Sequence, residues 1–174
     1  MRTNLIIVFT CPDRPGIVEQ LTREVIRCGG NWEESRSARL CGDFAGIARV
    51  SVSTDQSDEL SHRLSKLNIE GLTLHVKPAG NEPAVRGTTA SLHCTGADHE
   101  GIVHALASCL ASLGANVEEM ETFVEPAPST GTPVFSMTCS ICFPEELDRG
   151  LVLERLRELA AELAVDVSLD NQPI

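Results

Sequence analysis

The sequence has no long apolar stretch. Its purely apolar runs end after about five residues, whereas a membrane-spanning helix needs roughly 20. Residues 1–4 lead into a strand-like run rather than into the charged and apolar segments of a signal peptide. With 174 residues, 42% of them hydrophobic, the chain can bury one ordinary core or two small ones. We therefore expect a soluble globular protein with no membrane partner and a cytoplasmic location.

Basic residues are scarce in the second half of the chain. Residues 1–80 hold ten Lys and Arg against ten Asp and Glu, whereas residues 81–174 hold four against fifteen, so the whole net charge of −11 lies in the second half. Nonspecific affinity for nucleic acid comes from basic side chains on phosphates. Direct nucleic-acid binding is therefore not expected, and a role in transcription would require a protein partner.

Disulfide and catalytic signatures are also missing. The seven cysteines are scattered without framework spacing, so we expect them reduced and mostly buried. Cys139 and Cys142 form a lone CxxC whose members should lie on opposite strand faces. His99 and His104 are spaced i, i+5 rather than the i, i+4 of a zinc-protease helix, and with His93 they are interpreted as ordinary strand and helix residues. Because no nucleophile elbow, P-loop or dinucleotide fingerprint occurs either, we expect no metal, no cofactor and no enzymatic activity.

What the sequence does contain is an internal repeat with an offset of 85 residues. Without any gap, matching residues recur in the two copies: Asp13, Gly16, Ile17, Val18, Leu21, Gly29, Asn31, Glu33 and Glu34 fall on Asp98, Gly101, Ile102, Val103, Leu106, Gly114, Asn116, Glu118 and Glu119. We predict two homologous domains, residues 1–80 and 86–174, with a linker at about 78–87.

Each copy predicts the same order of elements. The apolar residues of the helices recur with the 3.6-residue period, Pro15 suits a first helical position, and Gly29-Gly30 and Gly114 end the helices. The expected elements are strands at 4–10 and 89–95, helices at about 15–28 and 100–113, strands at 31–40 and 116–124, strands at 44–53 and 134–143, helices at 57–67 and 146–163, and strands at 72–77 and 165–170. This β-α-β-β-α-β order is the ferredoxin-like unit of the α+β class.

The second strand of each copy is expected at one edge of its antiparallel sheet. Residues 32–39 and 117–122 are polar and charged, which suits a solvated edge. The other interpretation is that the two edges meet, because Arg36 and Glu121 are equivalent under the offset and would approach with opposite charges. We predict this second arrangement, in which the two sheets join edge to edge into one eight-stranded sheet.

The run Asp13-Arg14-Pro15-Gly16-Ile17-Val18 after the first strand, followed by Gly29-Gly30-Asn31 before the second, resembles the ACT domain. Two such units with nothing else resemble the glycine cleavage system transcriptional repressor family over nearly the whole chain. The resemblance implies that small ligands, commonly amino acids, bind at the interface between ACT domains. By matching position, the ligand-binding candidates are Asp13, Pro15, Gly16 and Asn31 in the first copy and Asp98, Gly101 and Asn116 in the second.

An amino acid suits these residue types. Asp can accept hydrogen bonds from its ammonium group, Asn can donate and accept, and backbone N–H groups at a helix start can hold its carboxylate. Purely structural roles stay open: the Asp residues as helix caps or Asx turns, the Asn residues in left-handed turns, and the Gly residues as steric necessities. The second copy reads Asp98-His99-Glu100-Gly101, without the Arg and Pro of the first, so its site is expected to be degenerate or altered in specificity.

These observations predict a non-enzymatic regulatory protein. By resemblance it would respond to glycine or a similar amino acid and would act on glycine cleavage genes through a DNA-binding regulatory protein. The main alternative is a stand-alone allosteric subunit that binds a metabolic enzyme and confers amino-acid feedback, and a third is a vestigial enzyme. A homodimer is compatible with each of them.

Overall fold

The computed structural model describes residues 1–80, 87–170 and 172–174. The chain divides into two compact units, Met1–Asn81 and Glu82–Ile174. The predicted linker at 78–87 lies largely outside the described residues. Among the described residues, no helix is both long and apolar enough to cross a membrane.

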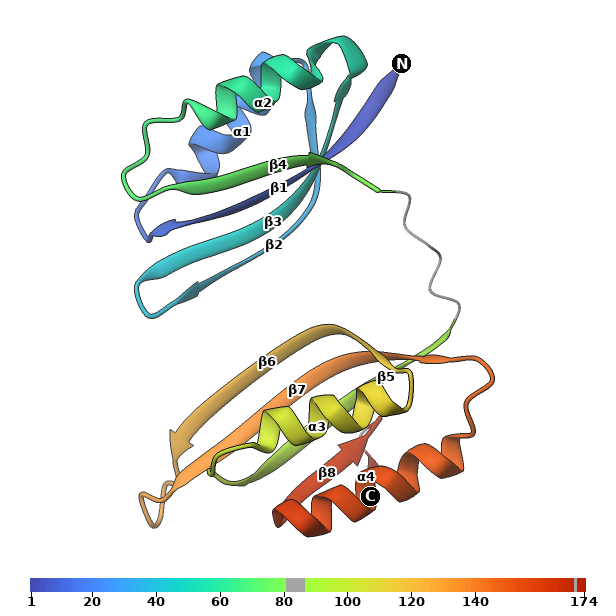
Figure 1. The fold of residues 1–174 in the computed structure, drawn as a ribbon. Helices are drawn as coiled ribbons and strands as arrows, with labels where there is room; N and C mark the ends of the chain where they lie inside the picture. Colours follow the sequence, from blue (N-terminus) through green and yellow to red (C-terminus); the bar gives the residue numbers. More distant parts are fainter. Residues whose placement is uncertain (81–86, 171) are drawn as a thin grey trace. The chain divides into compact units, whose positions relative to one another are not determined.

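Unit 1 is a four-stranded antiparallel sheet with two α-helices. Its elements in chain order are β1 (Arg2–Pro12), α1 (Ile17–Arg27), β2 (Asn31–Leu40), β3 (Asp43–Ser53), the short 3₁₀ helix η1 (Thr54–Gln56), α2 (Ser57–Ser65) and β4 (Thr73–Pro78). The strands are arranged β2-β3-β1-β4 (Figure 1). This order confirms the ferredoxin-like prediction for the first copy.

Unit 2 repeats the arrangement and adds one short strand. Its elements are β5 (Gly87–Ala97), α3 (Ile102–Ser112), β6 (Asn116–Pro126), β7 (Pro133–Pro144), α4 (Arg149–Leu163), β8 (Val165–Leu169) and β9 (Gln172–Pro173). The strands are arranged β6-β7-β5-β8-β9. Strand β9 was not predicted, because two residues are too few to show an alternating pattern.

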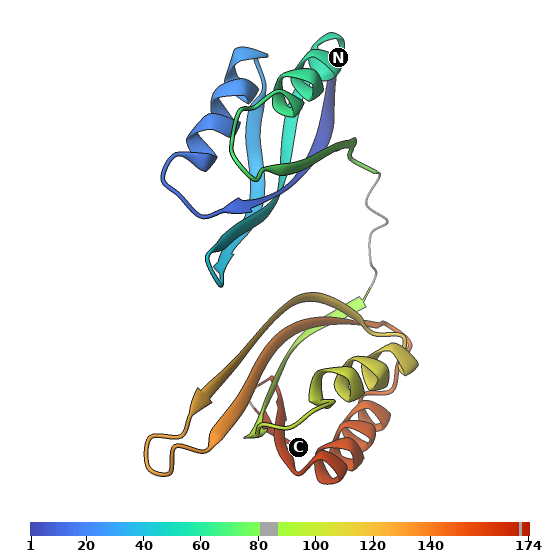
Figure 2. The same cartoon turned by 60° about the vertical axis from the view of Figure 1, so that its left-hand side comes forward.

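Each unit buries one face of its sheet under its own two helices (Figures 1 and 2). In unit 1, alternate residues of β1 such as Ile7 and Phe9 are buried, and Leu21 of α1 belongs to the same core. In unit 2, Leu92 of β5 and Leu156 of α4 are fully buried in a separate core. The strand alternation thus separates a helix-covered face from an open face.

Strands β2 and β6 lie at sheet edges, as predicted. Every residue of β6 is exposed. Each edge strand carries an irregularity at the same place in the repeat, between Trp32 and Glu34 in β2 and between Val117 and Glu119 in β6. The expectation that these edges join the two sheets into one is not confirmed by the strand pairing and stays a prediction.

Candidate functional site

The loop after β1 is fixed to the hairpin between β2 and β3. The Asp13 N–H donates to the Gly42 carbonyl at 2.8 Å. Arg39 Nε lies 2.9 Å from Asp13 Oδ2, and the Asp13 side chain is 34% exposed. The Asp13 carboxylate therefore already has a cationic partner at the position where an ammonium group is expected.

Helix α1 begins at Ile17, two residues after Pro15. The N-cap is Gly16, whose φ of 91° lies in the left-handed region that glycine adopts without steric cost. Pro15 is therefore not the first helical residue, which corrects the predicted boundary. Within the described part of the chain, no side chain caps this helix start, so Asp13 is not its cap, and first-turn N–H groups remain for an anion.

A second support for this loop is the connection between α2 and β4. Arg14 Nη1 lies 4.0 Å from Glu70 Oε2. Gly71, with a φ of 71°, approaches Pro12 so closely that a Cβ at this position would lie 2.7 Å from Pro12 Cδ. The loop is thus held from both sides, by the β2–β3 hairpin and by the α2–β4 connection.

Asn31 lies at the other end of the sheet from Asp13. It pairs with Ser51, which pairs with Asn4 near the start of β1, whereas Asp13 bonds to the hairpin beyond the end of β2. A ten-residue strand spans about 30 Å. Unit 1 therefore groups Asp13, Pro15 and Gly16 together but does not bring Asn31 to them.

Unit 2 reproduces this separation. The Asp98 N–H donates to the Pro133 carbonyl at 3.0 Å, at the base of the β6–β7 hairpin. Gly101 is the left-handed N-cap of α3, with a φ of 94°. Asn116 pairs with Cys142, which pairs with Thr89 near the far end of β5. The predicted residues of unit 2 therefore also form two groups at opposite ends of the sheet.

The two loops differ in the charge around their aspartates. Val124 occupies the position in β6 that Arg39 occupies in β2, because Val124 pairs with Phe135 as Arg39 pairs with Phe44. No ion pair reaches Asp98 from the part of the chain that the structure describes. The second loop, although it lacks the Arg and Pro of the motif, leaves its carboxylate more available than the first.

His99, interpreted from the sequence as an ordinary strand or helix residue, instead makes two contacts from the β5–α3 loop. Its Nδ1 lies 3.1 Å from the Glu100 carbonyl oxygen and its Nε2 lies 2.9 Å from the Leu163 carbonyl oxygen. These contacts, first that to Leu163 and then that to Glu100, raise the pKa of His99 above its ordinary value, and the charge of Asp98 adds to this. The repeat held the signal that could have found it, since His99 occupies the position of Arg14.

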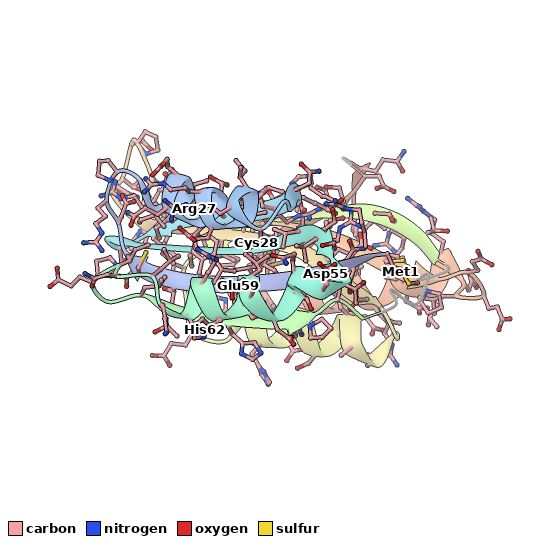
Figure 3. The ribbon with its side chains drawn as sticks, turned by 90° about the horizontal axis from the view of Figure 1, so that it is seen from above. Met1, Arg27, Cys28, Asp55, Glu59 and His62 are labelled. Carbon is pink, nitrogen blue, oxygen red and sulfur yellow. The ribbon has the colours of Figure 1, made fainter. Side chains whose placement is uncertain are left out.

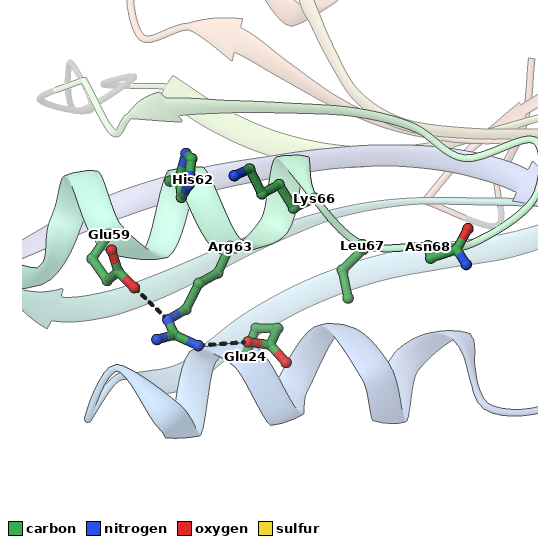
Figure 4. Close-up of a pocket in the computed structure, with 7 residues that line it drawn as sticks. All are labelled: Glu24, Glu59, His62, Arg63, Lys66, Leu67 and Asn68. Atoms are coloured by element: carbon green, nitrogen blue, oxygen red, sulfur yellow. Dashed lines mark ion pairs between the residues drawn. The ribbon is translucent and has the colours of Figure 1, made fainter.

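A hollow of about 380 Å³ lies at the helix layer of unit 1, away from the predicted loops. Figure 3 shows this layer from above, with Arg27 and Cys28 at the end of α1 and Glu59 and His62 on α2. In the hollow, Arg63 bridges two carboxylates, at 2.7 Å from Glu59 and 3.7 Å from the nearly buried Glu24 (Figure 4). Glu24 also pairs with Arg27 at 2.6 Å. Of these three pairs, Arg63–Glu24 joins α2 to α1, and the other two lie within one helix.

A second hollow, of about 540 Å³, lies over the strands of unit 2. Polar side chains of three strands line it, among them Thr95, Ser136, Asp166 and Ser168. His93 lies among them, 3.0 Å from Ser91 Oγ and 3.2 Å from Thr138 Oγ1. Neither hollow is lined by any of the seven predicted ligand-binding residues, and no metal-binding cluster occurs among the residues that the structure describes.

Both the sequence and the fold are similar to those of known proteins. Residues 3–77 match the ACT domain family. A crystal structure of an unknown protein from Galdieria sulphuraria is 30% identical and superposes with a TM-score of 0.87, covering 100% of this chain and 99% of that one. Unit 1 is an ACT domain. Unit 2 lies outside the family match, and the repeat and the shared topology relate it to unit 1.

The chain also resembles a transcriptional regulator. It is 24% identical to the glycine cleavage system transcriptional repressor of Escherichia coli over 175 residues, covering 95% of this chain and 88% of the repressor. A crystal structure of a protein assigned as a glycine cleavage system transcriptional repressor superposes with a TM-score of 0.71 and is 19% identical, covering 97% of this chain and 96% of that one. At this identity the match supports the fold alone. The similarity extends over both units rather than over one ACT domain.

Proposed function

We propose that the chain is a tandem ACT protein, a non-enzymatic, amino-acid-responsive regulator of glycine cleavage genes that acts through a protein partner. The observation that carries the proposal is the 24% identity to the repressor over 95% of the chain. Both ACT units fall within that similarity, and regulation by a bound amino acid is what the ACT resemblance implies. The effector is glycine or a similarly small amino acid.

The charge distribution supports action through a partner rather than on DNA directly. Residues 81–174 hold four basic and fifteen acidic side chains. The exposed strand β6 carries four of the glutamates: Glu118, Glu119, Glu121 and Glu125. Such a surface repels phosphate but complements a basic DNA-binding protein.

The effector is held by two ACT edges rather than by one unit. Each unit places its Asp-containing loop and its Asn at opposite ends of the sheet, so a single unit cannot present both groups to one amino acid. If two edge strands of the β2 type pair antiparallel, the loop of one unit meets the Asn of the other. The Asp then receives the ammonium group, and the helix start and the Asn receive the carboxylate.

Regulation then follows from differential affinity. An amino acid held between two ACT edges favours the paired arrangement only to the extent that it binds that arrangement better than the unpaired one. The partner would bind one of these arrangements preferentially, so effector concentration would control complex formation.

Calorimetry with a panel of amino acids tests the effector site. We expect binding heat for glycine or another small amino acid with the wild-type chain and reduced heat with Asp13→Ala and Asn31→Ala. Asp58→Ala, an exposed change in the first turn of α2 at a residue that is not among the seven candidates, is the matched control and should bind as the wild type does. Unchanged heat with both site variants would reject the proposed residues.

Partner identity tests the regulatory role. We expect the protein to leave a glycine cleavage promoter fragment unshifted in a gel assay when alone, and to change the shift produced by a DNA-binding regulator. Direct retardation of the fragment by the protein alone would contradict action through a partner. Co-purification with a metabolic enzyme, whose activity then responds to an amino acid, would instead favour the allosteric-subunit alternative.

A further inference from the structure

His99 connects the β5–α3 loop to the end of α4. Its two ring nitrogens face two backbone carbonyl oxygens, Nδ1 at 3.1 Å from that of Glu100 and Nε2 at 2.9 Å from that of Leu163. Leu163 is the last residue of α4. A helix leaves its final carbonyl groups without intrahelical partners, and His99 supplies the partner for this one.

The contacts determine which form of the imidazole fits. A carbonyl oxygen can only accept a hydrogen bond, whereas a neutral imidazole has one N–H donor and one acceptor nitrogen. Only the imidazolium ion can donate to both carbonyl groups. We propose that His99, as an imidazolium ion, is a positioning residue that clamps the β5–α3 loop, including Asp98, to the C-terminal end of α4.

The surroundings of His99 favour its charged form. The C-terminal end of a helix carries partial negative charge, which stabilises a cation. Helix α4 has no basic residue in its last turn that could compete, and Glu162 of that turn has the opposite charge. The hydrogen bond to the Leu163 carbonyl at the end of α4 raises the pKa of His99 most, followed by the one to Glu100, and the charge of Asp98 raises it further.

Unit 1 makes a related connection with a permanent charge. Arg14, at the position equivalent to His99, lies 4.0 Å from Glu70 in the connection between the second helix and the last strand of its unit. Arg stays protonated at all physiological pH values, whereas an unperturbed His has a pKa of about 6.5. The replacement of Arg14 by His99 in the repeat thus makes the clamp of unit 2 dependent on proton binding.

The direction of the pH dependence follows from the raised pKa of His99. A group whose pKa is higher in the folded state than in the unfolded chain stabilises the fold. This stabilisation is complete at pH values below the unfolded pKa, which is about 6.5 for His. That contribution is lost as the pH rises through the higher folded value. The clamp is therefore closed in mildly acidic solution and opens toward alkaline pH.

An NMR titration of the full chain tests the clamp without any ligand. The ring signals of the five histidines are followed with pH, and His99 is assigned by its loss in His99→Gln. We expect His99 to titrate above 6.5, and the backbone amides of Glu100, Gly101 and Val165 to shift with the same midpoint. Those amide shifts should disappear in His99→Gln, and in His99→Arg the amides should keep their low-pH positions.

His104→Gln is the matched control, because His104 is exposed on α3 in the same unit, and the amide titration should persist in it. A His99 midpoint at or below 6.5, or an unchanged amide titration in His99→Gln, would overturn the proposal. An effect of the clamp on effector affinity rests on the proposed function. Since the titration contains no effector, failure of the clamp and failure of effector binding are separate results.

Discussion

Arg39 Nε lies 2.9 Å from Asp13 Oδ2. The aspartate of the loop that best preserves the ACT motif is therefore ion-paired with an arginine of β2, the edge strand of the same unit. The equivalent position beside Asp98 is Val124. The first loop therefore preserves the ACT motif better, whereas the second loop has the more available carboxylate.

Replacing Arg39 by Val, the residue of the second unit, should raise the affinity of the first loop for an amino acid. At the proposed site, Arg39 would compete with the ammonium group for Asp13, and the substitution would remove this competition. We expect affinity to rise several-fold in an Asp98→Ala background, measured by calorimetry, while stability changes by less than about 1 kcal/mol because the pair is partly exposed. The reciprocal Val124→Arg in an Asp13→Ala background should weaken binding. Equal affinities in all of these variants would contradict the proposal that Asp13 and Asp98 bind the ammonium group.

Glu24→Gln should destabilise unit 1 by about 1–3 kcal/mol, because the change leaves charged and polar groups poorly paired where the carboxylate is buried. Glu24 is only 9% exposed at its side chain. It pairs with Arg27 and also with Arg63, as Figure 4 shows. Urea unfolding followed by fluorescence of Trp32 reports on this unit, since the chain has one Trp and it packs against the unit 1 core. Glu59→Gln, at a 46% exposed partner of the same Arg63, should cost less than about 1 kcal/mol. Equal costs for the two variants would contradict this account of the helix contact.

Gly16→Ala should cost about 1–2 kcal/mol of unit 1 stability, since Gly16 has a φ of 91° and an L residue is strained there. The space itself is open, because the nearest atom to an added Cβ is Gln20 Nε2 at 3.9 Å. The cost would thus come from the backbone rather than from a clash. Gly80→Ala, without a positive φ or a close neighbour, is the control in the same Trp32 assay. A Gly16→Ala chain that unfolds at the wild-type urea concentration would show that this helix start is not constrained.

The cysteines should differ sharply in their reactivity. All seven are free and five are buried, as predicted, while Cys41 is exposed. Burial, assisted by the charge of Asp166, raises the pKa of Cys94 to about 11, so only about one Cys94 thiol in a thousand is a thiolate at pH 8. Peptide mapping after brief iodoacetamide treatment should find Cys41 labelled first and Cys94 unlabelled. Comparable labelling of the two thiols would contradict the burial of Cys94.

Most of the fold could be predicted from the sequence because the repeat presents each periodic pattern twice. The helix boundary at Pro15 was wrong because Gly16 takes a left-handed conformation and delays the helix to Ile17. That choice depends on the path of the loop between the hairpin and Gly71, which the periodicity of the helix does not reveal.

The candidate site could be predicted only in part. The loops and the Asn positions follow from the motif, but their separation to opposite ends of the sheet depends on the strand directions. The Asp13–Arg39 pair depends on the register of β2 against β3. The His99 contact reaches a backbone atom of Leu163, 64 residues away, and a backbone acceptor leaves no mark in the sequence.

Double variants measured by calorimetry test the central claim most directly. If two antiparallel edges form two effector sites, Asp13 and Asn116 belong to one site, and Asp98 and Asn31 belong to the other. Asp13→Ala/Asn116→Ala should then keep about half of the wild-type binding stoichiometry, whereas Asp13→Ala/Asn31→Ala damages both sites and should lose nearly all binding heat. Identical titrations for the two double variants, or full wild-type heat in the second, would contradict the account.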